Sequence, residues 1–171
     1  GTSTLLMGPT GMGKSVLATH YAVTAARRGE RVAMYVFDER LQTLFQRAAG
    51  LGLDLEGPVD QGLITVRQVD PAELTPGEFS QIVTAAVDDG VRTVILDSLN
   101  GYAYAMPQEK LLCLHLHELL SVLNQKAVTS IHVMTQHGLV GQPESGVDVS
   151  YIADNVLLLR PFEHRGTMRK C

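Results

Sequence analysis

The sequence of 171 residues lacks several features that mark particular classes of protein. It has no tryptophan and only two cysteines, too few for a disulfide framework, so a reducing, cytoplasmic location is expected. No apolar run approaches the roughly 20 residues of a membrane span, and the N-terminus lacks the pattern of a signal peptide. The net charge of −4 gives no basic excess for nucleic acid. The composition, 45% hydrophobic and 19% charged, instead predicts one globular α/β domain without a membrane or nucleic-acid partner.

The strongest motif runs from Gly8 to Ser15 and reads Gly-Pro-Thr-Gly-Met-Gly-Lys-Ser, the spacing of a phosphate-binding loop. Its glycines let backbone N–H groups surround phosphates, while Lys14 would reach the β- and γ-phosphates and Ser15 would bind Mg²⁺. An apolar strand pattern precedes the motif and an Ala-rich helical pattern follows it, as such a loop requires. The alternative is a glycine-rich turn without a ligand. The residues expected to contact phosphates are Thr10, Gly11, Met12, Gly13, Lys14, Ser15 and Val16.

Short apolar runs alternate with helical patterns along the chain, without a linker or a repeat. Because these runs are apolar throughout, we expect a mostly parallel sheet covered by helices on both faces, with ligands at the carboxyl ends of the strands. Residues 100–107 and 136–149 are predicted loops at such ends. The predicted strands are residues 4–7, 32–37, 63–68, 93–96, 130–135 and 155–159. The predicted helices are residues 13–28, 41–51, 76–89 and 108–126.

Two polar residues that end predicted strands are candidates for the same site. Asp97 follows the apolar run Val-Ile-Leu, and beside a phosphate loop such a carboxylate holds Mg²⁺ through water or orients Ser15. The alternative for Asp97 is a helix cap or a turn. Gln136 ends the strand 130–135 and could sense the γ-phosphate, or be a loop residue in water. The histidines show no metal-ligand spacing, so the sequence predicts neither a zinc site nor covalent chemistry.

The adjacent acids Asp38 and Glu39 follow the predicted strand 32–37. A carboxylate there can orient the water that attacks the γ-phosphate or accept its proton, if this strand neighbours the first one. An ordinary acidic start to the next helix, favoured by the helix dipole, is an equal alternative. These residues alone do not decide between the two.

Several stretches together resemble a known family and span nearly the whole chain. The chain is similar to KaiC-type ATPases, from the RecA-like branch of phosphate-loop NTPases. Residues 160–169 resemble the strand-turn segment of that family. The stretches that carry the resemblance are residues 3–15, 37–39, 48–55, 94–102 and 149–159.

The resemblance assigns the family's paired catalytic acids to Asp38 and Glu39. The family usually has Glu-Glu, so Asp38 is one methylene shorter, and we expect Glu39 to be the main base with Asp38 assisting. Lys14 completes the expected catalytic set. The second KaiC repeat phosphorylates a Ser-Thr pair on a neighbouring subunit. The matching positions are Ser150 and Tyr151, which makes Ser150 a candidate phosphosite and serine autokinase activity a weaker expectation.

KaiC-like domains assemble into hexameric rings with ATP between subunits, and basic residues from the neighbour complete each site. In the family these residues follow the segment seen here, and a Gly/Leu-rich stretch precedes the first strand. The sequence lacks both segments and an initial methionine, so we expect residues 1–171 to be a fragment of one RecA/KaiC-like ATPase domain. Assembly and full turnover are expected of the longer protein, with regulatory proteins as partners.

The function expected from the sequence is therefore binding of ATP and Mg²⁺ with slow hydrolysis, in a signalling or circadian-clock-like setting. Turnover is slow because catalysis here depends on positioning and charge neutralisation, part of which a partner supplies. One alternative is a DNA-acting recombinase or helicase of the same fold, which would show salt-sensitive DNA contacts. The other is a non-catalytic module whose oligomeric state ATP controls.

Overall fold

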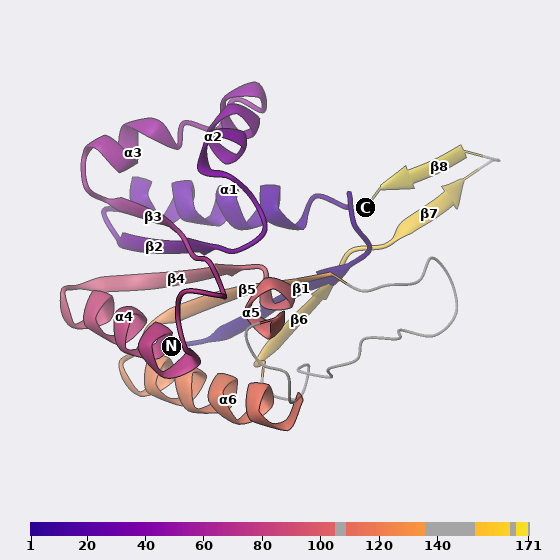
Figure 1. Cartoon of the computed structure of the whole chain (residues 1–171). Helices are drawn as coiled ribbons and strands as arrows, with labels where there is room; N and C mark the ends of the chain where they lie inside the picture. The colour runs from indigo at the N-terminus through magenta and orange to yellow at the C-terminus, as the bar shows by residue number, and fades with distance from the viewer. Residues whose placement is uncertain (105–108, 136–152, 165–166, 171) are drawn as a thin grey trace.

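The computed structural model describes residues 1–104, 109–135, 153–164 and 167–170. Within these residues, six strands form one sheet in the order β3-β2-β4-β5-β1-β6, and all neighbouring pairs are parallel (Figure 1). This confirms the predicted fold class, a RecA-like α/β core with a mostly parallel sheet. The strands are β1 (Ser3–Gly8), β2 (Arg31–Val36), β3 (Ile64–Gln68), β4 (Val91–Asp97), β5 (Thr129–Thr135) and β6 (Asn155–Leu158).

Helices cover both faces of this sheet, with α1, α2 and α3 on one side and α4, α5 and α6 on the other (Figure 1). Successive residues of β2 alternate between the two sides, so Val32 and Met34 pack in one core and Ala33 and Tyr35 in the other. The strands read as continuous apolar runs because both faces are packed. None of the described helices has the length and apolar character needed to cross a membrane. The helices are α1 (Lys14–Arg27), α2 (Leu41–Gly50), α3 (Glu56–Asp60), α4 (Pro76–Asp88), α5 (Leu99–Tyr104) and α6 (Glu109–Gln125).

Helix α4 shows how the sequence sets the start and the inner side of a helix. The Thr75 hydroxyl accepts a hydrogen bond from the Glu78 N–H at 3.3 Å, and the Glu78 carboxylate accepts one from the Thr75 N–H at 2.8 Å. This capping box satisfies backbone donors at the beginning of the helix. Phe79, Val83 and Val87 then recur every fourth residue and are buried in the core beneath the sheet.

The predicted strands and long helices all occur, and their described bounds differ from the predictions only at terminal residues. The predicted loop at 100–107 is wrong in its described part, because Leu99–Tyr104 forms the short helix α5. Leu99 and Tyr102 lie one helical turn apart and are both buried, which gives α5 a packed side. The sequence also does not predict α3, since five residues are too few to show a helical period.

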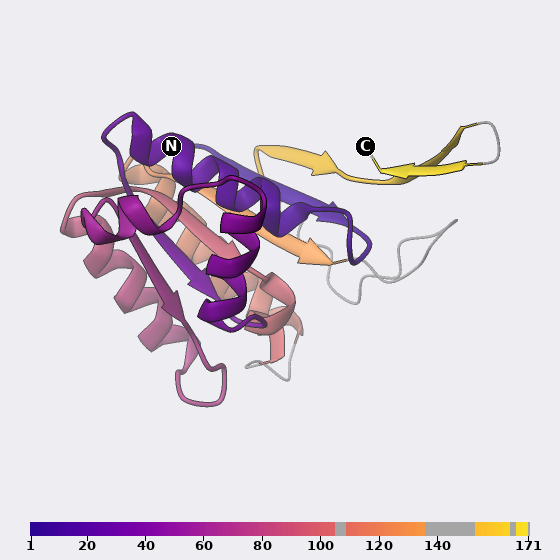
Figure 2. The ribbon, with the colours of Figure 1, turned by 90° about the horizontal axis from the view of Figure 1, so that it is seen from above.

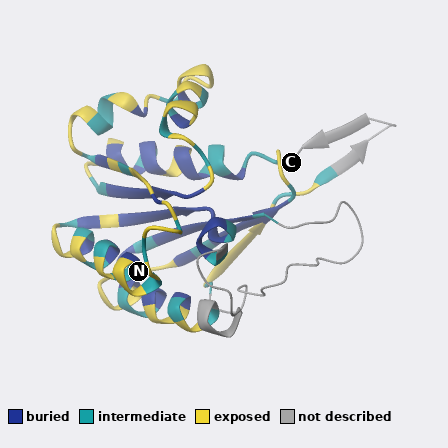
Figure 3. Ribbon diagram, in the orientation of Figure 1, coloured by how far each residue is buried: buried dark blue, intermediate teal, exposed yellow. Residues whose placement is uncertain are grey.

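Strand β6 departs from the expectation that apolar strands are buried on both faces. All of its residues are exposed, and Leu157 is 40% exposed, at the edge of the sheet beside β1 (Figure 3). An apolar run does not reveal which strand will lie at an edge. The Asp154 carboxylate fixes the start of β6 to that of β1 by accepting hydrogen bonds from the Ser3 N–H at 2.7 Å and hydroxyl at 3.0 Å. These two bonds, first that from the N–H, lower the pKa of Asp154.

The chain continues from β6 into a second, separate pair of strands. β7 (Pro161–His164) and β8 (Thr167–Lys170) pair in antiparallel fashion, with Pro161 opposite Lys170. Figure 2 shows this pair extending away from the main sheet. It corresponds to the strand-turn segment expected at residues 160–169.

His132 is a buried polar residue within β5, only 2% exposed. Its Nε2 lies 3.0 Å from the Ser130 hydroxyl oxygen, and its Nδ1 is buried without a hydrogen-bond partner among the described residues. Burial lowers the pKa of His132 to about 4, because a charged imidazole would lose its hydration. The folded protein therefore keeps this ring neutral at pH values at which the unfolded chain protonates it.

We expect His132 to make the protein less stable as the pH falls. Between pH 7 and pH 5 the free energy of unfolding should drop by about 2 kcal/mol through this residue, since only the unfolded imidazole takes up a proton there. The loss begins near the unfolded pKa of 6.5 and is complete below the folded pKa of about 4. Urea unfolding across this pH range measures it. The variant His132→Gln should lose this part of the pH dependence, and the exposed His20→Gln should retain it; equal slopes in wild type and His132→Gln would contradict the neutral ring.

Candidate active site

The phosphate loop joins the end of β1 to the start of α1. Gly13 caps α1 with a φ angle of 91°, a left-handed conformation that residues with a Cβ rarely adopt. The Lys14 side chain is buried, and its Nζ donates hydrogen bonds of 2.8 Å to the carbonyl oxygens of both Gly8 and Pro9. Burial lowers the pKa of Lys14, and the Asp97 carboxylate opposes that shift. The loop thus places a cation beside the N-terminus of α1, an arrangement suited to phosphate.

Asp97 at the end of β4 meets the phosphate loop through Ser15. The Ser15 hydroxyl donates a hydrogen bond of 3.1 Å to Asp97 Oδ1, although β5 separates β4 from β1 in the sheet. Asp97 is 8% exposed, and burial raises the pKa of its carboxyl group, with the Ser15 hydrogen bond and the charge of Arg47 acting in the opposite direction. The predicted proximity of Asp97 and Ser15 is therefore confirmed, while the bound metal remains a prediction.

Asp38 and Glu39 follow β2. The prediction for this pair required β2 to be the neighbour of β1, and it is not. Strands β4 and β5 lie between them, so that condition is wrong. Both acids nevertheless line the same cavity as Lys14. The reason is the course of α1, which lies across the face of β5, β4 and β2 and brings the phosphate loop toward the ends of these strands (Figure 2).

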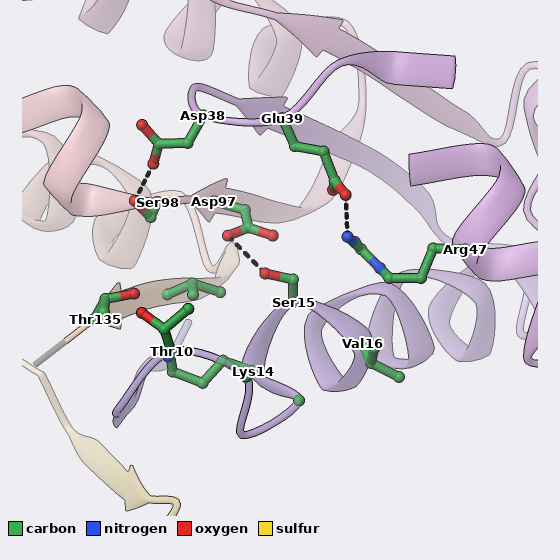
Figure 4. A pocket seen from close by; sticks show the side chains of 13 residues that line it. Thr10, Lys14, Ser15, Val16, Asp38, Glu39, Arg47, Asp97, Ser98 and Thr135 are labelled. Atoms are coloured by element: carbon green, nitrogen blue, oxygen red, sulfur yellow. Dashed lines mark hydrogen bonds and ion pairs between the residues drawn. The ribbon is translucent and has the colours of Figure 1, made fainter. Parts of the chain in front are cut away.

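The cavity between these elements has a volume of about 440 Å³, within the usual range of small-molecule sites (Figure 4). The phosphate loop forms one wall, and the ends of β2, β4 and β5 form the other. Of the predicted phosphate contacts, Met12 is not among the lining residues. The lining residues are Thr10, Gly11, Gly13, Lys14, Ser15, Val16, Asp38, Glu39, Arg47, Asp97, Ser98, Val133 and Thr135.

Two lining residues that the sequence does not single out hold the pair of acids. The Ser98 hydroxyl donates a hydrogen bond to Asp38, and Arg47 Nη1 donates one to Glu39 Oε1 (Figure 4). The position of Ser98, directly after Asp97, was the only signal for it in the sequence. Arg47 lies on α2, and nothing in the sequence shows that its side chain turns back toward Glu39.

Asn100 at the start of α5 ties the end of β5 to the site. Its side-chain oxygen accepts a hydrogen bond of 2.7 Å from the Thr135 N–H, and its side-chain nitrogen donates one of 3.1 Å to the Thr135 carbonyl oxygen. This paired contact fixes the last residue of β5, which lines the cavity. The predicted γ-phosphate sensor, Gln136, is the next residue and lies outside the described residues, as does the candidate phosphosite Ser150.

The donors in the cavity suit Mg²⁺ bound together with phosphate. Within the described residues there is no group of three or more His, Cys, Asp or Glu side chains that could hold a metal ion by themselves. Ser15 and Asp97 place two side-chain oxygen atoms 3.1 Å apart, and these are the atoms that would bind the ion. Mg²⁺ commonly takes one or two protein ligands and completes its shell with phosphate oxygens and water. These two side chains are therefore suited to Mg²⁺ when the phosphates of a nucleotide supply further ligands.

Comparisons with known proteins agree with this geometry. A family model described as "ATPase: KaiC" matches residues 1–171. The "Circadian clock oscillator protein KaiC" of Thermostichus vulcanus is 25% identical over 168 residues, which cover 97% of this chain and 32% of that protein. The "Circadian clock protein KaiC3" of Synechocystis sp. is 27% identical over 169 residues, covering 97% and 33%. The chain thus spans about a third of the length of the curated relatives it matches.

Gly101 in α5 allows this helix to approach the end of β2 closely. A Cβ at this position would overlap the Cβ of Phe37 and lie 2.7 Å from Asp38 Oδ1. We expect Gly101→Ala to lower the free energy of unfolding by about 1–3 kcal/mol, because the neighbouring backbone must move. Gly77→Ala in α4 is the matched control, since a Cβ there meets nothing within 4 Å. It should be neutral or stabilise by up to about 1 kcal/mol. Chemical denaturation compares the two, and equal effects would contradict the close approach.

Proposed function

This chain belongs to the KaiC ATPase family, and we propose that it binds ATP with Mg²⁺ in the cavity described above and hydrolyses it slowly. The observation that carries the proposal is the convergence of the phosphate loop, Asp97 and the Asp38-Glu39 pair on one cavity. These groups come from the ends of separate strands, β1, β4 and β2. A nucleoside triphosphate with a divalent cation accounts for each of them.

Binding would use groups that the protein already holds in position. Lys14 would exchange its hydrogen bonds to two loop carbonyls for bonds to the β- and γ-phosphates. Ser15 and Asp97 would hold the ion, and Mg²⁺, when bound, would neutralise charge on the phosphate oxygens. The backbone N–H groups from Thr10 to Val16 would bind the phosphate chain.

Hydrolysis would use Glu39 as the base. A water oxygen attacks the γ-phosphorus, the water proton passes to the Glu39 carboxylate, and ADP leaves with the bridging oxygen. The Glu39 side chain is 22% exposed and is held by Arg47, so its position is defined before substrate arrives. Asp38 is exposed and bound to Ser98, consistent with an assisting role. Lys14 stabilises the charge that develops on the transferred phosphoryl group.

For the biological process that this activity serves, the proposal relies on the related proteins. Because the relatives named above are circadian clock proteins, a role in timing or signalling is the favoured setting. The resemblance to KaiC-like domains adds the proposal that the protein works within a hexameric ring. Autophosphorylation of Ser150 stays a prediction from the sequence. The DNA-acting alternative has no particular support, since the net charge is −4. The alternative of a non-catalytic module predicts bound ATP and a changed oligomeric state without release of phosphate.

We expect Lys14→Ala to abolish ATP binding, because the β- and γ-phosphates lose their fixed counter-ion. Asp97→Asn should weaken ATP binding in the presence of Mg²⁺ more than in its absence. Isothermal titration calorimetry with and without Mg²⁺ measures both effects. Lys126→Ala, which removes a partly exposed lysine paired with Asp88, is the control and should bind ATP normally. Equal ATP affinity in wild type and Lys14→Ala would rule out the proposed site.

We expect Glu39→Gln to retain ATP and to reduce turnover by roughly 10²-fold or more, because the amide keeps the size of the side chain but cannot accept the proton. Asp38→Asn should have a smaller effect. The measurement is phosphate release by the full-length protein, in which neighbouring subunits can complete the site. The exposed Glu56→Gln is the control for loss of one carboxylate. Wild-type turnover in Glu39→Gln would mean that the pair of acids is structural.

A further inference from the structure

Arg47 occupies a position that the proposed chemistry does not yet use. It projects from α2 into the cavity and, with Lys14, is one of two cationic side chains among the described lining residues. Its Nη1 donates to Glu39, and its side chain is only 28% exposed. Its Nη2 is buried and has no hydrogen-bond partner among the described residues. A donor of this kind, at the wall of a cavity, points to an acceptor that binds there.

The two cations of the cavity differ in how their hydrogen bonds are satisfied. Lys14 has two loop carbonyls as acceptors at 2.8 Å. Arg47 has one carboxylate and one donor nitrogen left over. A buried N–H without an acceptor is destabilising, so an arriving acceptor relieves that cost. Of these two cations, Arg47 is therefore the one with a buried donor that an arriving anion would satisfy.

The surrounding charges define what that acceptor is. Asp38, Glu39 and Asp97 all line the cavity, and the charge of Arg47 acts on Asp97 as well as on Glu39. A further carboxylate would be repelled by these acids unless it brought its own cation. A phosphate bound with a divalent cation meets that requirement. Guanidinium groups also match phosphate oxygens well, because their planar set of donors can serve two acceptors at once.

We infer that Arg47 contacts the terminal phosphate of ATP from within the same chain, with Nη1 on Glu39 and Nη2 on a γ-phosphate oxygen. The inference rests on the proposed function. Arg47 then links the base Glu39 to the phosphate that the attacking water reaches. It also distinguishes ATP from ADP, because only ATP presents a γ-phosphate oxygen to Nη2. The site has a positive charge at the γ-phosphate before any other subunit contributes one.

The test compares the affinities of the non-hydrolysable analogue β,γ-imido-ATP and of ADP, both with Mg²⁺, by calorimetry on the full chain. We expect Arg47→Gln to weaken binding of the triphosphate analogue by about tenfold or more, as for loss of a charged hydrogen bond, and that of ADP by less than about threefold. Arg40→Gln removes an exposed arginine at the start of the same helix and should leave the ratio of the two affinities unchanged. An unchanged ratio in Arg47→Gln, or an equal loss for both nucleotides, would overturn the inference.

Two further variants separate the remaining explanations. Glu39→Gln removes the ion pair but leaves Arg47, so the triphosphate analogue should bind Glu39→Gln more tightly than it binds Arg47→Gln. An equal loss of affinity in the two variants would mean that Arg47 acts only through Glu39, and would overturn the direct contact. Arg47→Lys keeps the charge but not the planar donors, so it should reduce the ratio of triphosphate-analogue affinity to ADP affinity at least threefold. This variant provides the test if Arg47→Gln does not fold. Failure of wild type to bind either nucleotide would instead refute the proposed function, whereas normal binding with no effect of Arg47 refutes this inference alone.

Discussion

The described acids of the candidate site lie together because the strands of the main sheet are parallel and end at one edge. Each strand that ends there can carry one or two polar residues, and Asp97 and the Asp38-Glu39 pair follow β4 and β2 in this way. The path of α1 is the second part of the constraint. Since α1 lies across β5, β4 and β2, the phosphate loop reaches residues from strands that are not neighbours of β1. The Ser15–Asp97 hydrogen bond is the point at which the two sides meet.

The electrostatic balance of the cavity follows from this convergence. Three carboxylates line the cavity. Burial is the main cause that raises the pKa of the most buried one, Asp97, and the charges of Glu39 and Asp38 act in the same direction. Lys14 and Arg47 oppose this accumulation of negative charge, one from the loop and one from α2. The pair Arg47–Glu39 is partly exposed, so its value lies in positioning rather than in stability, since ion pairs of this kind contribute little to folding.

The sequence predicted the parts of the site that depend on local order along the chain. The phosphate loop is contiguous, and Asp97 and Glu39 directly follow apolar strands, so their neighbourhood could be inferred without a structure. Arg47 could not be found, because whether its side chain turns toward β2 depends on how α2 packs. The exposure of β6 and the separation of β2 from β1 were also missed. Both depend on the lateral order of strands, which hydrophobic patterns do not encode.

The family and the individual residues rest on different kinds of support. Membership in the KaiC ATPase family follows from a match over residues 1–171, although the relatives named above share only about a quarter of their residues with this chain. At this level of identity the family match supports the fold and the phosphate loop. The side chains on the wall of the cavity opposite the phosphate loop are positioned by individual contacts. Those contacts hold Glu39 by Arg47 and Asp38 by Ser98, all within one chain. The positions of both acids at the cavity therefore follow from contacts within a single chain.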